Sequence, residues 1–397
     1  MAPPVSLSVV PIVRPALDEA EAQAAANVVR SGWLMQGQQV QRFEQALGAY
    51  LTDDDGAPHV VAVVNGTAAL ELALRAVGVG PGDEVITVSH SFIATANSVL
   101  AVGATPVFVD VHADTLGMDP TQAERALSPK TKAILCVHQL GYACDLEGLM
   151  AVAAQAGVAL IEDAACALGT EIHIANRWRK IGRPQGDVAC FSFHPRKVIT
   201  TGEGGAVVTN NDAWATRLRG LRQHAIPAMA PRADPDLPDG YAYPAYNARM
   251  TDICAAIGLI QLAKLPSLLS ERRAQAMTLH AQLRDNKILA PAPTPDLQRP
   301  NWQSYPARLR ATSPLTAADV LAFLKNQGIS ARGGLTNAHQ EPAYTSNSTG
   351  WRAAALTMSE RLRREVIMLP LFPGLAPGEK AQLQDALKAL DSTNGSP

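Results

Sequence analysis

The stretch FSFHPRKVITTGEGGAVVTN, residues 191–210, places one lysine between an apolar run and a group of glycines. The segments DVACFSF (187–193) and GGAVVTN (204–210) predict two neighbouring strands, joined by the loop that carries Lys197. A lysine in such a loop is usually a solvated side chain. The alternative is an amine held at a strand end to react with a carbonyl. The segment alone leaves both interpretations open.

Outward from this segment, short β-branched runs alternate with helical patterns. VVAVVN (60–65) and EVITVS (84–89) are typical of buried strands, and TAALELALRAV (67–77) between them has helical periodicity. The alternation continues through TPVFVDV, KAILCVHQ and VALIEDAA. It predicts an α/β fold with a largely parallel sheet covered by helices on both faces. Ligands of such folds gather at the carboxyl ends of the strands.

The C-terminal part of the chain has a different pattern. Residues 225–248 are rich in Pro, Asp and Tyr, which predicts a long functional or disordered loop. A helical stretch follows at 250–285, and Pro266 is expected to kink or split it. The remainder predicts a smaller α+β domain. Because 397 residues exceed what one core usually supports, two domains are expected.

Composition excludes several classes of partner. The 34 Lys+Arg against 36 Asp+Glu give a net charge of −2, without the basic excess that nucleic acid binding requires. No uncharged run is long enough to span a bilayer, so no membrane partner is expected. The cysteines form no CxxC pair and have no His at metal spacing, which predicts reduced thiols in a cytoplasmic protein and no metal site. They are Cys136, Cys144, Cys166, Cys190 and Cys254.

The segment NGTAALEL (65–72) follows a predicted strand and opens a helix. The backbone amides of Gly66, Thr67 and Ala68, together with the helix dipole, would hold a phosphate. The competing interpretation is a plain N-cap by Asn65 or Thr67, which is common at helix starts.

Two further strand ends carry candidate residues. In LIEDAACALG (160–169), Asp163 is either a helix cap or the partner that keeps a heteroaromatic nitrogen protonated. In SHSFIATANS (89–98), Phe92 is either a core residue or a flat contact for a planar ring. Each feature has an ordinary explanation, but with Lys197 they share the rim of one predicted sheet. Their conjunction favours a pyridoxal 5'-phosphate (PLP) site in which Lys197 forms the Schiff base.

A series of longer strings occurs in order from about residue 30 to the C-terminal region: SGWLMQGQQVQRFE, NGTAALELAL, GPGDEVITVSHSFIATANSV, GATPVFVDV, IEDAACALG, GDVACFSFHPRKVITTGEGGAVVTN and YNARMTDICAAIGLIQL. Together they resemble the DegT/DnrJ/StrS family of PLP-dependent sugar aminotransferases. The resemblance implies fold type I, with a large domain whose mostly parallel seven-stranded sheet is flanked by helices, and a smaller α+β C-terminal domain. The expected division is an N-terminal segment 1–30, a PLP-binding domain 31–270 and a small domain 271–397.

The resemblance also implies a role for particular residues. Lys197 would bind PLP and then move the proton during catalysis, Asp163 would pair with the pyridine nitrogen, and Phe92 would stack on the ring. A homodimer with shared active sites is expected. His194 is either a cofactor contact or a packed loop residue. The other expected cofactor contacts are Gly66, Thr67, Ala68, Cys166 and Ser192, with Asn247 reaching in from the neighbouring subunit.

The implied reaction moves an amino group from L-glutamate or L-glutamine to a ketone acceptor, typically a nucleotide-linked keto-deoxy sugar. Trp33 and Gln36 in GWLMQG (32–37) are expected near the acceptor. So are His339 and Tyr344 in NAHQEPAY (337–344), for which ordinary surface positions are the alternative.

Two departures from the family pattern bear on the substrate. Cys166 stands where the family commonly has Gln or His, and the loop 331–340 also differs. The acceptor is therefore open, and so are two other functions: a PLP-dependent dehydratase, deoxygenase or cyclase, and a non-catalytic PLP-binding regulator. Lys197 argues against the sugar dehydratases of the family, which typically have His at its position. Asp163 and Lys197 together argue against a regulator.

Overall fold

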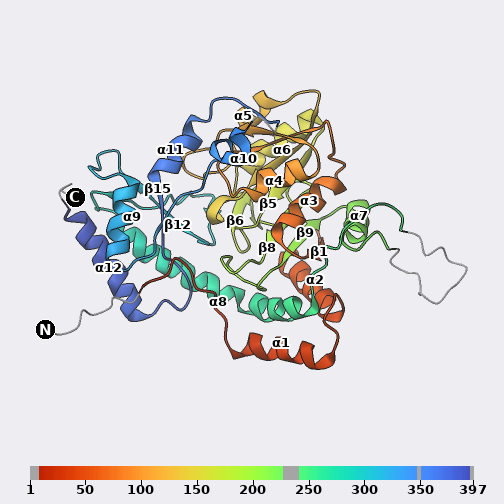
Figure 1. The fold of residues 1–397 in the computed structure, drawn as a ribbon, viewed down its shortest axis with the longest axis horizontal. Coiled ribbons are helices and arrows are strands. Elements are labelled where there is room, and N and C mark those ends of the chain that lie inside the picture. The colour runs from red at the N-terminus through yellow and green to blue at the C-terminus, as the bar shows by residue number, and fades with distance from the viewer. Residues whose placement is uncertain (1–8, 227–240, 347–349, 394–397) are drawn as a thin grey trace, which may run out of the picture.

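The computed structural model describes residues 9–226, 241–346 and 350–393, and its main feature is an eight-stranded sheet (Figure 1). β9 runs antiparallel to both of its neighbours, β1 and β8, and the other pairings are parallel. In order across the sheet, the strands are β1 His59–Val63, β9 Gly205–Thr209, β8 Val188–Ser192, β5 Ala159–Asp163, β4 Thr131–Val137, β2 Glu84–Val88, β3 Thr105–Val109 and β14 Arg352–Ala353.

The mostly parallel α/β architecture is confirmed, and the sheet has one strand more than the seven expected. The eighth strand, β14, is a two-residue segment of the C-terminal part that pairs with β3 at the sheet edge. Arg352 in β14 forms an ion pair with Glu84 at 2.6 Å. This ion pair holds the C-terminal segment against the start of β2. Two residues carry no periodicity, so the sequence pattern does not reveal this strand.

Both faces of the sheet are buried. In β1, Val60 and Ala62 belong to one apolar cluster, while Val61 and Val63 belong to another. This division follows from the alternation of side chains along a strand. The helices that accompany the sheet are α2 Gln38–Leu51, α3 Gly66–Ala76, α4 Ala94–Ala101, α5 Pro120–Ala126, α6 Leu146–Ala156 and α7 Asp212–Arg222.

The C-terminal part builds a second, four-stranded sheet in which the pairings are antiparallel. Its strands, in order, are β10 Leu289–Ala290, β12 Tyr305–Leu309, β15 Val366–Leu369 and β13 Arg332–Gly333. Its helices are α9 Ala317–Asn326, α10 Pro342–Thr345, α11 Thr357–Glu365 and α12 Pro377–Asp391. A third sheet consists of β11 Gln298–Arg299, β6 Glu171–Ile174 and β7 Arg177–Lys180.

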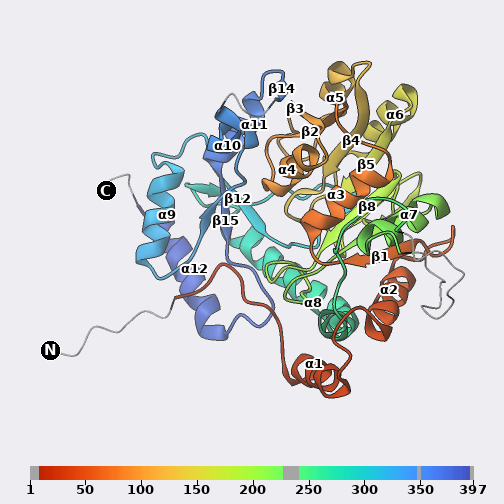
Figure 2. The ribbon, with the colours of Figure 1, turned by 45° about the vertical axis from the view of Figure 1, so that its right-hand side comes forward.

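Helix α8, Asp252–Leu283, connects the two main parts of the chain. Figure 2 shows it running from the region of α1 (Glu19–Ser31) and α2 toward β12 and β15. Pro266 lies inside this helix, which continues through it, so the expected split at this position does not occur. The predicted boundary at 270/271 falls within α8. By length and composition α8 is also apolar enough to cross a membrane, but it packs against α1 and α2 as a core helix does.

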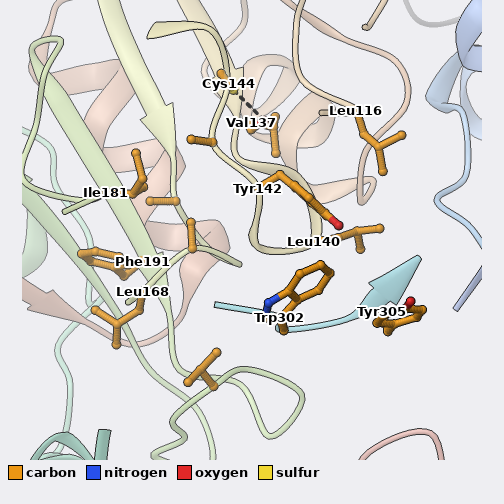
Figure 3. Packing of buried hydrophobic residues seen from close by; sticks show 14 of the residues in the cluster. Leu116, Val137, Leu140, Tyr142, Cys144, Leu168, Ile181, Phe191, Trp302 and Tyr305 are labelled. Carbon is orange, nitrogen blue, oxygen red and sulfur yellow. Dashed lines mark hydrogen bonds between the residues drawn. The ribbon is translucent and has the colours of Figure 1, made fainter. Parts of the chain in front are cut away.

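Aromatic packing joins the turn after β4 to the small sheet. Tyr142 contacts Trp302 edge to face with ring centroids 5.7 Å apart, and Trp302 stacks on Tyr305 of β12 at the same distance (Figure 3). Buried aromatic side chains contribute large apolar areas, so this contact fixes the small sheet against the large one.

The loop expected at 225–248 falls largely on residues 227–240, which lie outside the described residues.

Gly205 is the point where three segments of backbone meet. It pairs with Val63 on one side and Ser192 on the other. A Cβ atom here would lie 2.5 Å from the carbonyl oxygen of Asn65 and 2.8 Å from that of Phe191. Both neighbours are backbone atoms, which cannot turn away as a side chain does.

We expect Gly205→Ala to lower the free energy of unfolding by roughly 1–3 kcal/mol, because the added methyl group forces β1, β8 and β9 apart. Urea unfolding followed by circular dichroism measures this change. Gly80→Ala is the matched control, since a Cβ atom at Gly80 meets nothing within 4 Å. Equal unfolding midpoints for the two variants would contradict the prediction.

Candidate active site

The predicted site residues meet at one rim of the large sheet. Asn65 follows the end of β1, Phe92 follows β2, Asp163 ends β5 and Ser192 ends β8. The carboxyl ends of these strands point the same way, and the antiparallel β9 begins at the same edge. The loop that carries Lys197 therefore leaves and re-enters the sheet at this rim, as expected for a ligand site of an α/β fold.

The start of α3 combines both interpretations of NGTAALEL. Asn65 caps the helix, since its side-chain oxygen accepts from the amide of Ala68 at 2.8 Å. This corrects the expectation that the Ala68 amide binds phosphate, because the cap already uses it. Among the described residues, the amides of Gly66 and Thr67 have no hydrogen-bond acceptor, as is usual for the first turn of a helix.

Gly66 brings this helix start against β8. A Cβ atom on Gly66 would lie 2.7 Å from the Cβ atom of Ser192 and 3.1 Å from its Oγ. The absence of a side chain at Gly66 thus places two backbone amides and one hydroxyl side by side. This donor set, at a helix N-terminus, suits a phosphate group.

Short hydrogen bonds fix the loop of Lys197. The amide of Lys197 donates to the carbonyl of His194 at 2.8 Å, which forms a turn over residues 194–197. Thr200 Oγ1 and the amide of Thr201 both donate to the carbonyl of Phe193, at 2.8 Å and 3.0 Å. Gly202 then turns the chain back with φ +81°, a conformation that favours glycine. The lysine is therefore part of a defined loop.

His194 lies within this turn as a packed loop residue. Its Nδ1 accepts from the amide of Arg196 at 3.2 Å. Burial lowers the pKa of His194 below its usual value, the carboxylate of Glu203 raises it, and the charge of Lys197 also lowers it. The net shift is downward, which favours the neutral ring.

Asp163 is almost completely buried, with 4% of its surface exposed. Its Oδ2 accepts from Thr95 Oγ1 at 2.9 Å, and its Oδ1 accepts from the amide of Ala165 at 3.1 Å. Burial raises the pKa of this carboxyl, while these two hydrogen bonds and the charge of Lys197 lower it. The net shift is upward. A buried carboxylate near a cation is a common feature of functional sites.

The neighbouring Glu162 has a structural role that the sequence did not indicate. Its Oε2 accepts from His138 Nε2 at 3.0 Å, and its Oε1 accepts from the amides of Gln185 and Gly186. The amide of Cys144 donates to His138 Nδ1 at 3.1 Å, so the ring proton of His138 lies on Nε2. These bonds hold the turn before β8 against β5, next to Asp163.

Phe92 projects from the rim with 71% of its surface exposed. A side chain with this exposure has most of its ring surface outside the apolar core. The core interpretation is therefore wrong for Phe92 in this structure.

Cys166 lies at the same rim, and its Sγ accepts a hydrogen bond from Lys197 Nζ at 3.1 Å.

The loop 32–37 is anchored by a residue that the sequence analysis missed. Asp252, at the start of α8, accepts from the amides of Gly37, Gln39 and Val40 at 2.8–3.2 Å and so caps α2. Trp33 is 56% exposed, and Gln36 Oε1 is buried without a hydrogen-bond partner among the described residues. The segment MTDIC has an acid at the start of a helix, which indicates a capping residue. It does not reveal that Asp252 caps α2, a helix more than 200 residues earlier in the chain.

The C-terminal candidates occupy two different environments. His339 Nδ1 bonds Ser89 Oγ at 2.7 Å, and its Nε2 lies 3.4 Å from Glu360 Oε1, so His339 ties its loop to the end of β2. Tyr344 is only 2% exposed, and its hydroxyl donates to Asn97 at 2.8 Å. This burial corrects the expectation for Tyr344, which packs on Phe108 and is not open to an acceptor.

Asn247 comes directly before Ala248, whose carbonyl accepts from the amide of Val64 after β1. Asn247 is exposed and forms a single β-bridge with Gln223. Its expected role across a subunit interface stays a prediction.

The arrangement fits a phosphorylated heteroaromatic cofactor. Two free amides and the Ser192 hydroxyl suit the phosphate, the exposed Phe92 ring suits one face of a planar group, and the buried Asp163 suits a protonated ring nitrogen. Lys197 supplies an amine beside this acid. Such a set can attach a carbonyl compound and move protons next to it.

Comparisons with known proteins agree with this geometry. A sequence model described as the DegT/DnrJ/EryC1/StrS aminotransferase family matches residues 15–388. DesV of S. venezuelae, solved in complex with a ketimine intermediate, is 31% identical, with 97% of this chain and 99% of that chain covered and a TM-score of 0.85.

Two further solved structures are similar. DesI, solved in the presence of its TDP-sugar product, is 29% identical, with a TM-score of 0.85 over 98% of this chain and 94% of that chain. Spr1654 of Streptococcus pneumoniae, a putative sugar aminotransferase, was solved in a PLP form and a PMP form. The PLP form is 26% identical, with a TM-score of 0.85 over 96% of this chain and 98% of that chain.

Asp163→Asn should flatten the pH dependence of stability in the cofactor-free chain. An acid whose pKa is higher in the folded than in the unfolded chain binds its proton more tightly when folded. The free energy of unfolding therefore falls as the pH rises through the interval above the ordinary value of 3.8. Urea unfolding at a series of pH values measures the slope, and Asp212→Asn, at an exposed carboxylate, is the control. The prediction fails if Asp163→Asn leaves the slope unchanged.

Proposed function

The chain belongs to the DegT/DnrJ/EryC1/StrS aminotransferase family of PLP-dependent enzymes, and on this premise we propose that it aminates a keto-deoxy sugar or a related natural-product intermediate. The proposed donor is L-glutamate or L-glutamine. The proposed acceptor is linked to a nucleotide, as suggested by the TDP-sugar product present with DesI. The proposed location is the cytoplasm, where free cysteines persist.

The observation that carries this proposal is the pairing of a reactive amine with a buried acid at one rim. Lys197 lies close enough to Asp163 for its charge to lower the pKa of that carboxyl. PLP, when bound, supplies an electron sink that stabilises negative charge at the carbon next to the amino group. Gly66, Thr67 and Ser192 would hold its phosphate, and Phe92 would lie against its ring.

The chain's own residues then have separate tasks. Asp163 keeps a proton on the facing ring nitrogen through a charge-assisted hydrogen bond. Thr95 and Ala165 hold that carboxylate in place. Lys197 Nζ takes a proton from the donor carbon in one half-reaction and returns one to the acceptor carbon in the other. The ordered 194–201 turn keeps this amine above the rim in both half-reactions.

The proposed acceptor contacts come from the loop 32–37. Trp33 is exposed, and Gln36 is partly buried, with an oxygen that has no hydrogen-bond partner among the described residues. His339 contributes through its ring edge at the end of β2, where Ser89 orients it.

The homodimer is proposed from exposed apolar side chains. Trp33, Leu34 and Met35 are each about half exposed, and Phe92 is exposed at the sheet rim. Large exposed apolar side chains gathered around a site are typical of subunit interfaces. In a two-fold dimer the same surface meets its own copy, so each subunit can complete the site of the other. Asn247 is the proposed contribution from the partner.

Lys197→Ala should abolish turnover, with a loss of roughly 10²–10⁴-fold or more, because it removes the group that moves the proton. Purified wild-type protein incubated with PLP should show a visible absorbance band that changes on adding L-glutamate. Borohydride reduction should attach the cofactor to the peptide that contains Lys197. Lys325→Ala, an exposed lysine of α9, is the control.

Product analysis separates the remaining functions in the same assay. Transamination yields a primary amine and a 2-oxo acid, whereas a dehydratase, deoxygenase or cyclase does not. Turnover by Lys197→Ala, or a wild-type protein that binds PLP but releases no 2-oxo acid with either donor, would contradict the proposal.

Mixing inactive variants tests the shared site. Each proposed site combines Lys197 of one subunit with Asn247 of the other. In a mixed dimer of Lys197→Ala and Asn247→Ala, both defects fall in one site, and the second site has both wild-type residues. Unfolding and refolding the two variants together should therefore recover activity that neither shows alone. Mixing Lys197→Ala with Asp163→Asn is the control, because both lie in the same half. Sedimentation showing a monomer, or equal activity in the two mixtures, would count against the shared dimer site.

A further inference from the structure

Cys166 is the residue in direct contact with the reactive amine. Lys197 Nζ donates to Cys166 Sγ at 3.1 Å, across 31 residues of sequence. This is the only hydrogen bond of Nζ among the described residues, and no ion pair with a carboxylate competes with it there. The partner of the amine is therefore sulfur.

Both members of this pair are held in place. Lys197 lies in the turn closed by His194. On the other side, the carbonyl of Cys166 accepts from Asn301 Nδ2 at 2.9 Å, and Asn301 is fully buried. Asn301 also donates to the carbonyl of Leu168 at 2.9 Å, so it clamps the segment after β5 from two points. The backbone segments that carry the two side chains are therefore both held by hydrogen bonds.

The remaining cysteines do not share this environment. Cys136, Cys144 and Cys190 are buried, and the Cys144 thiol donates to the carbonyl of Val137 at 2.8 Å (Figure 3). Cys254 is partly exposed but lies in the first turn of α8. Cys166 is also partly exposed and has a lysine amine as its neighbour. A cation beside a thiol favours the thiolate, which is the reactive form of cysteine.

We propose that Cys166 is a positioning residue for Lys197: its sulfur accepts a hydrogen bond from the amine and holds it at the rim whenever that amine is free. The other charged groups that face the amine are Asp163, which attracts it, and His194, whose ring is favoured in its neutral form. The role in the reaction rests on the proposed function; the pair itself does not.

The pair is tested by the rate of thiol alkylation. Full-length wild type, Lys197→Met and Lys197→Arg are treated with iodoacetamide at neutral pH in excess pyridoxamine 5'-phosphate, which does not bind lysine covalently. Peptide mass spectrometry measures each cysteine, with labelling of Cys254 as the internal reference. We expect Lys197→Met to slow labelling of Cys166 roughly fivefold or more, because the cation that favours the thiolate is gone. Lys197→Arg should keep most of the wild-type rate. Equal Cys166 rates in wild type and Lys197→Met would overturn the proposal.

A second measurement tests the role in the reaction. Cys166→Ala and Cys166→Ser are compared in the half-reaction with L-glutamate. Loss of the sulfur should lower kcat with little change in KM, because the amine is then no longer held at the rim for proton transfer. Cys166→Ser should fall between Cys166→Ala and wild type.

The two measurements fail in different ways. Lysine-dependent labelling in a protein without transaminase activity would reject the proposed function and keep the pair. A wild-type kcat in Cys166→Ala would reject the positioning role.

Discussion

The site depends on the pairing of three strands at Gly205, which lies between Val63 of β1 and Ser192 of β8. Three strand ends meet there with no side chain between them, because Gly205 leaves room for the carbonyl of Asn65. Gly66 allows a second close approach, to Ser192. The start of α3 and the lysine loop are thus brought to one rim by the absence of side chains at two positions.

The carboxylate of Asp163 lies at the same rim, in a buried position that disfavours its charged form. Burial of Asp163 raises its pKa, and the hydrogen bonds from Thr95 and Ala165 offset only part of that effect. A folded protein usually avoids such a group unless it has a partner. Glu162, the next residue back along the chain, has its partners within the protein: His138 and two backbone amides. Two adjacent acids at one strand end therefore have different surroundings: Glu162 is bound by the protein on both oxygens, whereas Asp163 has a raised pKa.

Much of this could be predicted from the sequence. The strands were predictable because β-branched runs alternate with helices, and the meeting of Gly66, Phe92, Asp163 and Lys197 followed from the shared direction of parallel strands. Contacts that depend on distant packing were not predictable. The string NAHQEPAY indicated contacts to the acceptor or an ordinary surface loop, but Tyr344 is buried in a cluster with Phe108, Ala338 and Leu356. Asp252 caps a helix that begins more than 200 residues earlier, and no local pattern announces that partner.

The manner in which Asp252 binds the loop 32–37 has an evolutionary consequence. Its carboxylate accepts hydrogen bonds from backbone amides alone, and every residue except proline offers such an amide. The side chains at 33–36 can therefore be exchanged while the anchor stays the same. A lineage with this fold can therefore change the surface of this loop without losing the cap of the helix that follows it.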